Sequence, residues 1–101
     1  MSGILECFVD KLKSMDKAIV VLHYASHKND YFTRKDIEND LGQGYVRIPN
    51  KLVNRSHELQ RTKNASSSRE YYRITPIGTR GLNLWGDAHI EEKKLLECWD
   101  I

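Results

Sequence analysis

Residues 45–76 constrain the fold of this chain most, because they combine a short basic helical segment with two β-forming runs. The runs cover residues 59–63 and 69–74, and they flank a small polar segment at 64–68. This arrangement is typical of a β-hairpin. The sequence therefore predicts a hairpin with a flexible tip, whose flanks carry four basic residues: Arg61, Lys63, Arg69 and Arg73.

The segment before the hairpin, residues 46–59, has the spacing of an amphipathic helix. Ile48, Leu52 and Leu59, with Val53 beside them, fall near one stripe. Pro49 fits only the first turn, so the regular helix is expected to begin near Ile48. The opposite side carries residue types that suit DNA, because Arg and Lys neutralise phosphate or pair with guanine and Asn can bond adenine in two places. These candidate DNA-binding residues are Arg47, Asn50, Lys51, Asn54 and Arg55.

Positive charge is concentrated in the same region. The whole chain has a formal net charge of +2. Residues 42–82 hold eight basic residues against Glu58 and Glu70, a net charge of +6, whereas residues 1–41 sum to −1 and residues 83–101 to −3. Such a patch is the electrostatic footprint that phosphate binding requires. A solvated basic surface without a ligand is the alternative interpretation.

The sequence REYYRITPIG at residues 69–78 resembles the end of the wing in winged-helix transcription regulators of the PadR and MarR kind. In that family a YYRLTPxG pattern closes the hairpin and opens the next helix, with Thr75 here as the N-cap and Pro76 as the first helical residue. The resemblance extends less sharply over residues 14–85. It implies an α+β, mainly α fold, a winged helix-turn-helix with a two-stranded β wing and extra N- and C-terminal helices. It also implies double-stranded DNA as the partner and a homodimer formed through the terminal helices.

Two further helices are expected before the basic segment. Ser14 can cap the first, whose apolar face would be Met15, Ala18, Ile19, Leu22 and Ala25. The second, over residues 33–41, starts with an approximate capping box of Thr33 and Asp36. A hydrophobic staple of Phe32 and Ile37 supports the same start.

Glycines mark the turn that follows. Gly42 is expected to end the helix over residues 33–41. Gly44 is suited to the positive φ that such turns often need.

The ends of the chain are also predicted to be helical. An apolar stripe within residues 4–12 indicates an amphipathic helix. Residues 77–99 look helical although Gly78, Gly81 and Gly86 weaken the pattern. A break is expected near Gly86, with Asp87 capping a last helix that carries Ile90, Leu95, Leu96 and Trp99. The terminal helices either form a dimer interface or pack on their own core.

The length of 101 residues indicates a single domain, with an N-terminal helix at 1–13, a core at 14–85 and a C-terminal helix at 86–101. No apolar run approaches the roughly 20 residues of a membrane span, and no signal-peptide pattern is present. A cytoplasmic protein without a membrane partner is therefore expected. Without a Gly-rich phosphate loop or a nucleophile motif, neither an enzyme nor a cofactor is predicted.

The remaining reactive residues are interpreted as structural. Cys7 and Cys98 are expected to be reduced packing residues, with an intermolecular disulfide or redox switch as the alternative. His23 and His27 could share a metal with a cysteine, but no second ligand pair supports this, so no metal is predicted. Three alternating acids are expected on a solvated face: Asp36, Glu38 and Asp40.

Two functions remain compatible with the sequence. In the first, the chain is a DNA-binding transcription regulator whose helix at 47–58 enters the major groove while the hairpin follows the backbone or the minor groove. The alternative is a winged-helix protein–protein interaction module in a larger complex. Its binding would survive loss of the basic helix residues but fail when Phe8, Trp85 or Trp99 is changed.

Overall fold

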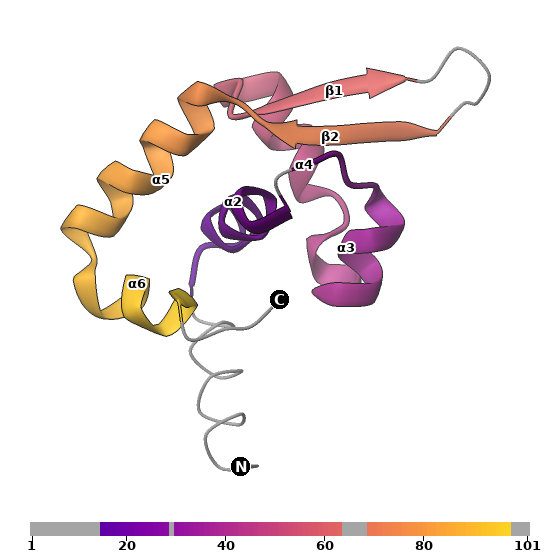
Figure 1. Ribbon diagram of the computed structural model, residues 1–101. Coiled ribbons are helices and arrows are strands. Elements are labelled where there is room, and N and C mark those ends of the chain that lie inside the picture. The colour runs from indigo at the N-terminus through magenta and orange to yellow at the C-terminus, as the bar shows by residue number, and fades with distance from the viewer. Residues whose placement is uncertain (1–14, 29, 64–68, 98–101) are drawn as a thin grey trace.

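The computed structural model describes residues 15–28, 30–63 and 69–97 (Figure 1). The fold is α+β and mainly helical, with a two-stranded antiparallel sheet. The predicted helix at 4–12 and the hairpin tip at 64–68 lie outside the described residues, as do Cys7, Cys98 and Trp99. The described elements, in chain order, are α2 (Lys17–Lys28), α3 (Arg34–Asp40), η1 (Gln43–Tyr45), α4 (Ile48–Lys51), η2 (Leu52–Ser56), β1 (Leu59–Lys63), β2 (Glu70–Ile74), α5 (Pro76–Ala88) and α6 (Ile90–Glu97).

Helix α2 lies at the centre of the molecule (Figure 1). All residues from Val20 to Ala25 are buried, so the helix is covered on every side rather than on one face. Elements α3 and α4 lie on one side of it, α5 and α6 on the other, and the hairpin crosses above (Figure 1). Helix α2 begins at Lys17, and the Asp16 carboxylate accepts a hydrogen bond from the Ala18 amide at 2.9 Å. The cap predicted at Ser14 lies outside the described residues.

The capping box of α3 is confirmed. The Thr33 hydroxyl accepts from the Asp36 amide at 3.2 Å, and the Asp36 carboxylate accepts from the Thr33 amide at 2.9 Å. Just before the cap, Phe32 exchanges two backbone hydrogen bonds with Tyr72 of β2, at 2.9 and 2.8 Å. The Phe32 ring packs between Tyr24 and Tyr72, with ring centroids 5.4 and 5.9 Å apart. This aromatic stack ties α2, the start of α3 and the hairpin into one core.

The turn after α3 confirms Gly42 as the end of the helix, but the positive φ predicted at Gly44 is wrong. Gly42 has a φ of 112°, whereas the φ of Gly44 is not positive. The left-handed backbone therefore comes directly at the end of α3, where it releases the chain from the helix. Helix α4 begins at Ile48 as predicted, with Pro49 in its first turn.

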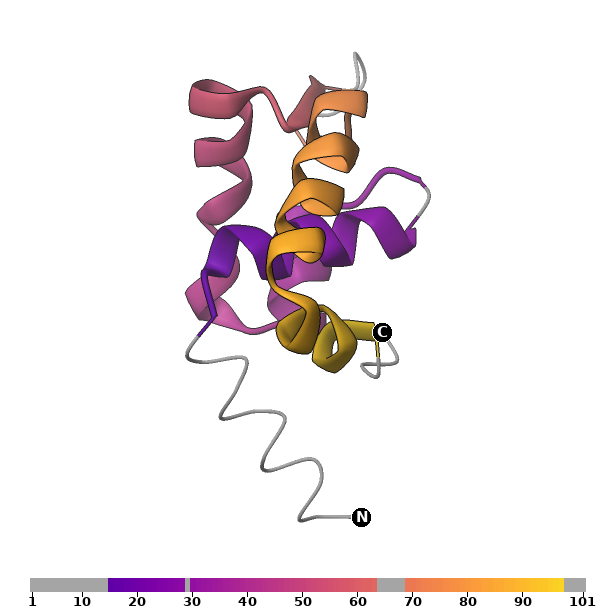
Figure 2. The same cartoon turned by 90° about the vertical axis from the view of Figure 1, so that its left-hand side faces the viewer.

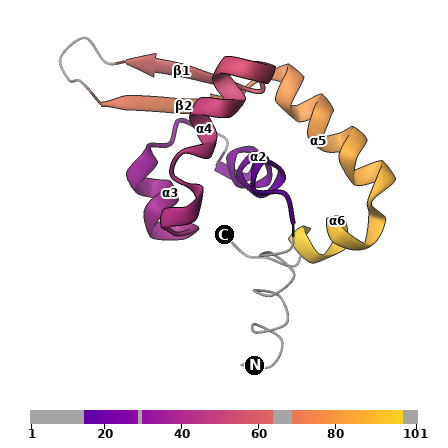
Figure 3. The same cartoon turned by 180° about the vertical axis from the view of Figure 1, so that it is seen from behind.

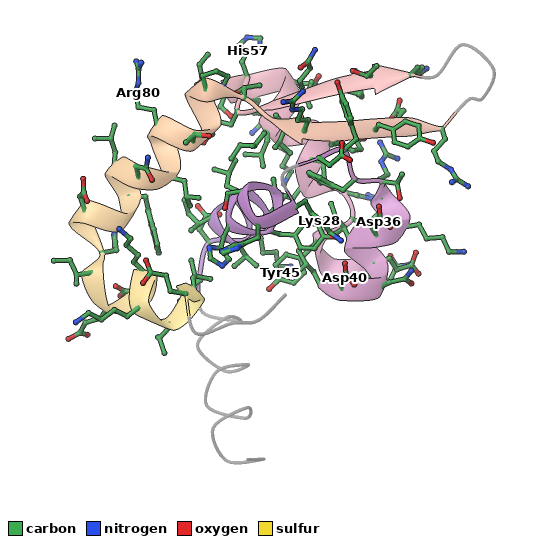
Figure 4. All side chains as sticks on the ribbon, in the orientation of Figure 1. Lys28, Asp36, Asp40, Tyr45, His57 and Arg80 are labelled. Atoms are coloured by element: carbon green, nitrogen blue, oxygen red, sulfur yellow. The ribbon has the colours of Figure 1, made fainter. Side chains whose placement is uncertain are left out.

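The acidic residues of α3 are partly the solvated face that was expected, because Glu38 and Asp40 are exposed and Asp36 is half-buried, but all three also make contacts within the fold. Asp36 forms the capping box, and the Glu38 carboxylate accepts from the Gln43 amide at 2.8 Å. The Asp40 carboxylate accepts from the buried Tyr24 hydroxyl at 2.6 Å and lies 3.5 Å from the Lys28 ammonium (Figure 4). Of these contacts, those of Asp40 fix α3 against α2.

The junction from β2 to α5 confirms Thr75 as the N-cap. Its hydroxyl accepts from the Gly78 amide at 3.1 Å, and Pro76 is the first helical residue. Two of the glycines in α5 face Glu58: a Cβ on Gly78 would lie 2.3 Å from the Glu58 carbonyl oxygen, and one on Gly81 3.0 Å from its carboxylate. Glycine is therefore needed at Gly78 for α5 to pack against the start of β1.

The end of α5 lies two to three residues beyond the predicted break. The helix continues to Ala88 and breaks at His89, so Asp87 lies inside α5 and is not the cap of the last helix. Gly86 lies under the Lys93 side chain of α6, which would be 2.8 Å from a Cβ there. Helix α6 thus folds back on α5 (Figure 2).

Helix α6 packs at least partly on its own chain. Leu96 is buried, and it borders a cavity of about 220 Å³ whose other walls are residues of α2 and α5, including His23 and Trp85. Ile90 at the start of α6 is exposed. Among the helices of the described chain, none combines the length and the apolar character needed to cross a lipid bilayer.

Candidate nucleic-acid interface

The predicted basic helix is α4 continued by one wider π turn, η2. Pro49 and Leu52 are buried and anchor one side of it on the core. The helix stops at His57, whose left-handed φ of 57° turns the chain toward β1. Leu59, placed on the helical stripe by the sequence pattern, is instead the first residue of β1, where it is buried.

The opposite side of this helix carries three exposed cations. Arg47, Lys51 and Arg55 are spaced four residues apart, which places them along one helix face. Within the described part of the chain, none of the three forms a salt bridge with a carboxylate. Asn54 is exposed beside them. Figure 3 views the molecule from behind, where α4 lies beside α2, between the hairpin and α3.

Asn50 has a different environment from the other four predicted helix residues. It is half-buried, and its side-chain oxygen accepts from the Tyr72 hydroxyl at 3.0 Å and from the Arg61 guanidinium at 3.5 Å. This oxygen is used within the protein, so the structure assigns Asn50 a contact between α4 and the hairpin.

The hairpin divides three of the four predicted basic residues between its faces. In the register of the two strands, Arg61 pairs with Tyr72 and Lys63 with Glu70. Arg61 and Lys63 therefore share a face with these partners, because cross-strand neighbours point the same way. Arg73 alternates to the other face, where its guanidinium lies 5.6 Å from the centre of the Tyr31 ring. All three cations are exposed.

The Glu70 carboxylate is the centre of a polar cluster that the sequence pattern did not indicate. It accepts from the Tyr72 hydroxyl at 3.0 Å and from Arg34 of α3 at 3.4 Å, and it lies 3.9 Å from the Lys63 ammonium. Arg34 also donates to the Tyr72 hydroxyl at 3.2 Å. The Tyr72 hydrogen bond, together with the nearby charges of Arg61, Arg34 and Lys63, holds the pKa of Glu70 below its ordinary value. Burial raises the pKa of the Tyr72 hydroxyl, which therefore stays protonated and able to donate.

Arg34 is the residue of this site that sequence reasoning missed. It lies 36 residues from Glu70 and 38 from Tyr72 along the chain, and no local spacing signals that contact. Together with Thr33, Lys35, Arg69 and Glu70 it borders a surface depression of about 300 Å³. Arg69, the fourth predicted hairpin residue, is thus exposed next to two cations of α3.

The arrangement places cations from three separate elements on the surface around the hairpin and α4. Arg47, Lys51 and Arg55 come from the helix, Arg34 and Lys35 from α3, and Arg61, Lys63 and Arg69 from the hairpin segment. Arg34 and Lys63 already pair with the Glu70 carboxylate. Arg47, Lys51 and Arg55 have no carboxylate partner in the described chain and can neutralise phosphates. Among the described residues, no group of three or more His, Cys, Asp or Glu side chains could hold a metal ion.

Comparisons of the chain with protein-family profiles, with curated proteins and with solved structures gave no match.

Proposed function

We propose that this chain binds double-stranded DNA as a winged helix-turn-helix transcription regulator. In this proposal α3 and α4–η2 form the helix-turn-helix, α4–η2 is the recognition helix, and the β1–β2 hairpin is the wing. The observation that carries the proposal is the row of Arg47, Lys51 and Arg55, which is exposed and has no carboxylate partner in the described chain. Carboxylates elsewhere neutralise cations of the fold, yet this row is left for an external anion.

The four exposed residues of the helix are the candidates for base contacts. Arg47 lies at the N-terminal edge of α4, where helix-turn-helix proteins commonly contact bases. Lys51, Asn54 and Arg55 follow along the exposed side. Asn50 has a supporting role, since its oxygen already accepts hydrogen bonds from Tyr72 and Arg61.

The hairpin cations have the role of backbone contacts, which set affinity more than sequence preference. Lys63 and Arg69 flank the tip of the wing, while Arg61 lies closer to α4. Arg73 lies on the other hairpin face beside Tyr31, so we assign it the smallest part in DNA binding of the nine predicted residues.

Fluorescence anisotropy with a labelled random duplex at low salt tests this proposal. The double variant Lys51→Ala, Arg55→Ala is expected to bind at least tenfold more weakly than the wild type, because two phosphate or base contacts are lost. The matched control is Lys93→Ala, Lys94→Ala in α6, which removes the same charge from exposed positions on a different element. Circular dichroism verifies that both variants fold.

Equal binding by the helix variant and the α6 control would contradict a DNA site on α4–η2. Absence of binding by the wild type at low salt would overturn DNA binding altogether. The second candidate function, a protein–protein interaction module, would then take its place. That function is favoured by the exposed apolar side chains of α5, Ile77 and Leu84.

A further inference from the structure

Helix α5 presents a face that the rest of the described chain leaves uncovered. Its inner side carries the buried Gly78 and Gly86 and the partly buried Leu82. The opposite side carries Ile77, Arg80, Leu84 and Asp87, all of them exposed. Ile77 and Leu84 keep 56% and 64% of their surface in contact with solvent. Arg80 projects away from the body of the molecule (Figure 4), and Figure 2 looks onto this side of α5.

The charges on this face have opposite signs at its two ends. Arg80 and Asp87 are seven residues apart, so they share one side of the helix and are separated by about 10 Å along its axis. Among the described residues, neither of them takes part in a salt bridge. Leu84 lies between them on the same side. Arg73 adds positive charge at the Arg80 end, where both border a surface groove together with Leu84.

This distribution is self-complementary in one orientation. If two copies of α5 lie antiparallel about a two-fold axis near residues 83 and 84, Arg80 of each copy lies opposite Asp87 of the other. In this orientation Leu84 lies against Leu84 of the partner subunit. Ile77 lies opposite the C-terminal end of the partner's α5. A two-fold interface needs a surface of this kind, because the same patch must serve both subunits.

We propose that the Ile77–Arg80–Leu84–Asp87 face of α5 binds a second copy of this chain in an antiparallel helix pair. The proposal does not depend on DNA binding and places the dimer contact on α5. A helix of 13 residues is about 20 Å long, so it supplies the centre of an interface of modest size. The resulting dimer is in exchange with the monomer.

Sedimentation equilibrium of the full chain, without DNA and over a wide concentration range, tests the proposal by charge exchange. Arg80→Glu and Asp87→Arg each place two like-charged pairs in the interface, because symmetry repeats every contact. Each single variant is expected to raise the dimer Kd about tenfold or more. The double variant Arg80→Glu, Asp87→Arg restores opposite charges and is expected to return Kd to within about threefold of the wild type.

Two further variants keep the result interpretable. Leu84→Lys places two charges at the two-fold axis and is expected to abolish the dimer. Lys94→Glu makes the same charge reversal on exposed α6 and is expected to leave Kd unchanged. Thermal unfolding of each variant verifies that the helix is intact, since all substituted positions are exposed.

A wild type that remains monomeric at every concentration overturns the proposal. The proposal is also overturned if the wild type dimerises but both single variants have the wild-type Kd, because the dimer contact then lies elsewhere. Weakening by both single variants without recovery in the double variant overturns the antiparallel pairing. Recovery in the double variant, with a normal response of Lys94→Glu, supports it.

Discussion

The Tyr72 hydroxyl lies 3.0 Å from the side-chain oxygen of Asn50, and this contact joins the hairpin to the helix that carries the exposed cations. The same hydroxyl lies 3.0 Å from Glu70 and accepts from Arg34 at 3.2 Å. Since Tyr72 can donate only one proton, Asn50 and Glu70 share it. The hydroxyl oxygen of Tyr72 therefore connects three elements: α3, α4 and β2.

Tyr72→Phe removes this oxygen and keeps the buried ring. We expect the free energy of unfolding to fall by about 1–3 kcal/mol, because the partners of a half-buried hydroxyl lose their hydrogen bonds. Urea denaturation measures the change, and Tyr71→Phe removes the same atom from the opposite face of β2. Equal stability of the Tyr72 variant and the Tyr71 control would contradict a structural role for the contact.

The lowered pKa of Glu70 predicts that the folded protein loses stability in acid. Its pKa is held below the ordinary 4.5 in the folded state, so its stabilising contribution is present above that pH and is lost as pH falls through the folded pKa. Thermal unfolding between about pH 3 and 6 should show a smaller acid loss for Glu70→Gln than for the wild type. Identical profiles would show that the cluster does not favour the charged carboxylate.

The lowered pKa of buried His23 predicts a second loss of stability, in a pH range above that of Glu70. Burial, with a smaller effect of the nearby His27, lowers its pKa from 6.5 to about 4, while a backbone hydrogen bond at Leu96 acts in the opposite direction. As the pH falls, His23 is protonated in the unfolded chain before it is protonated in the folded chain. The free energy of unfolding is therefore highest above pH 6.5 and decreases by up to about 3 kcal/mol as the pH falls toward 4. Denaturant midpoints across this window should change less in His23→Leu than in the wild type. A wild-type slope in the His23 variant would contradict the assignment.

The glycines of α5 predict opposite outcomes for two similar substitutions. Gly78→Ala forces a Cβ against the backbone carbonyl of Glu58, and we expect a loss of about 1–3 kcal/mol despite the better helix propensity. Gly81→Ala meets only the end of the flexible Glu58 side chain and should be neutral or stabilising by up to about 1 kcal/mol. Melting temperatures measure both. A Gly78 variant as stable as the Gly81 variant would contradict the close packing of α5 on β1.

Local patterns in the sequence predicted the element boundaries that depend on neighbouring residues. The capping box at Thr33 and Asp36, the N-cap at Thr75 and the helix start at Ile48 were all confirmed, because each rests on contacts within a few residues. The coarse α+β, mainly helical class followed from the same signals.

Contacts between distant segments could not be predicted in this way. The break at His89 lies two to three residues after the expected position at residues 86–87, because Gly86 accommodates Lys93 of α6 instead of ending α5. Asp40 is exposed as expected, but the hydrogen bond that its carboxylate accepts from Tyr24, 16 residues away, was not predicted. At the candidate interface, helical spacing predicted which side of α4–η2 is polar. The same spacing could not show that Asn50 contacts the hairpin while its neighbours are exposed, nor that Arg34 of α3 lies at this site.

The salt dependence of DNA binding tests the central claim most directly. Each phosphate neutralised adds about 0.9 to the slope of log K against log salt concentration, so Lys51→Ala, Arg55→Ala should reduce the slope by up to about 1.8. We expect the wild type and the control Lys93→Ala, Lys94→Ala to share a steep slope, and the helix variant to have a shallower one. A slope unchanged by the loss of Lys51 and Arg55 would contradict DNA contact by the exposed face of α4–η2.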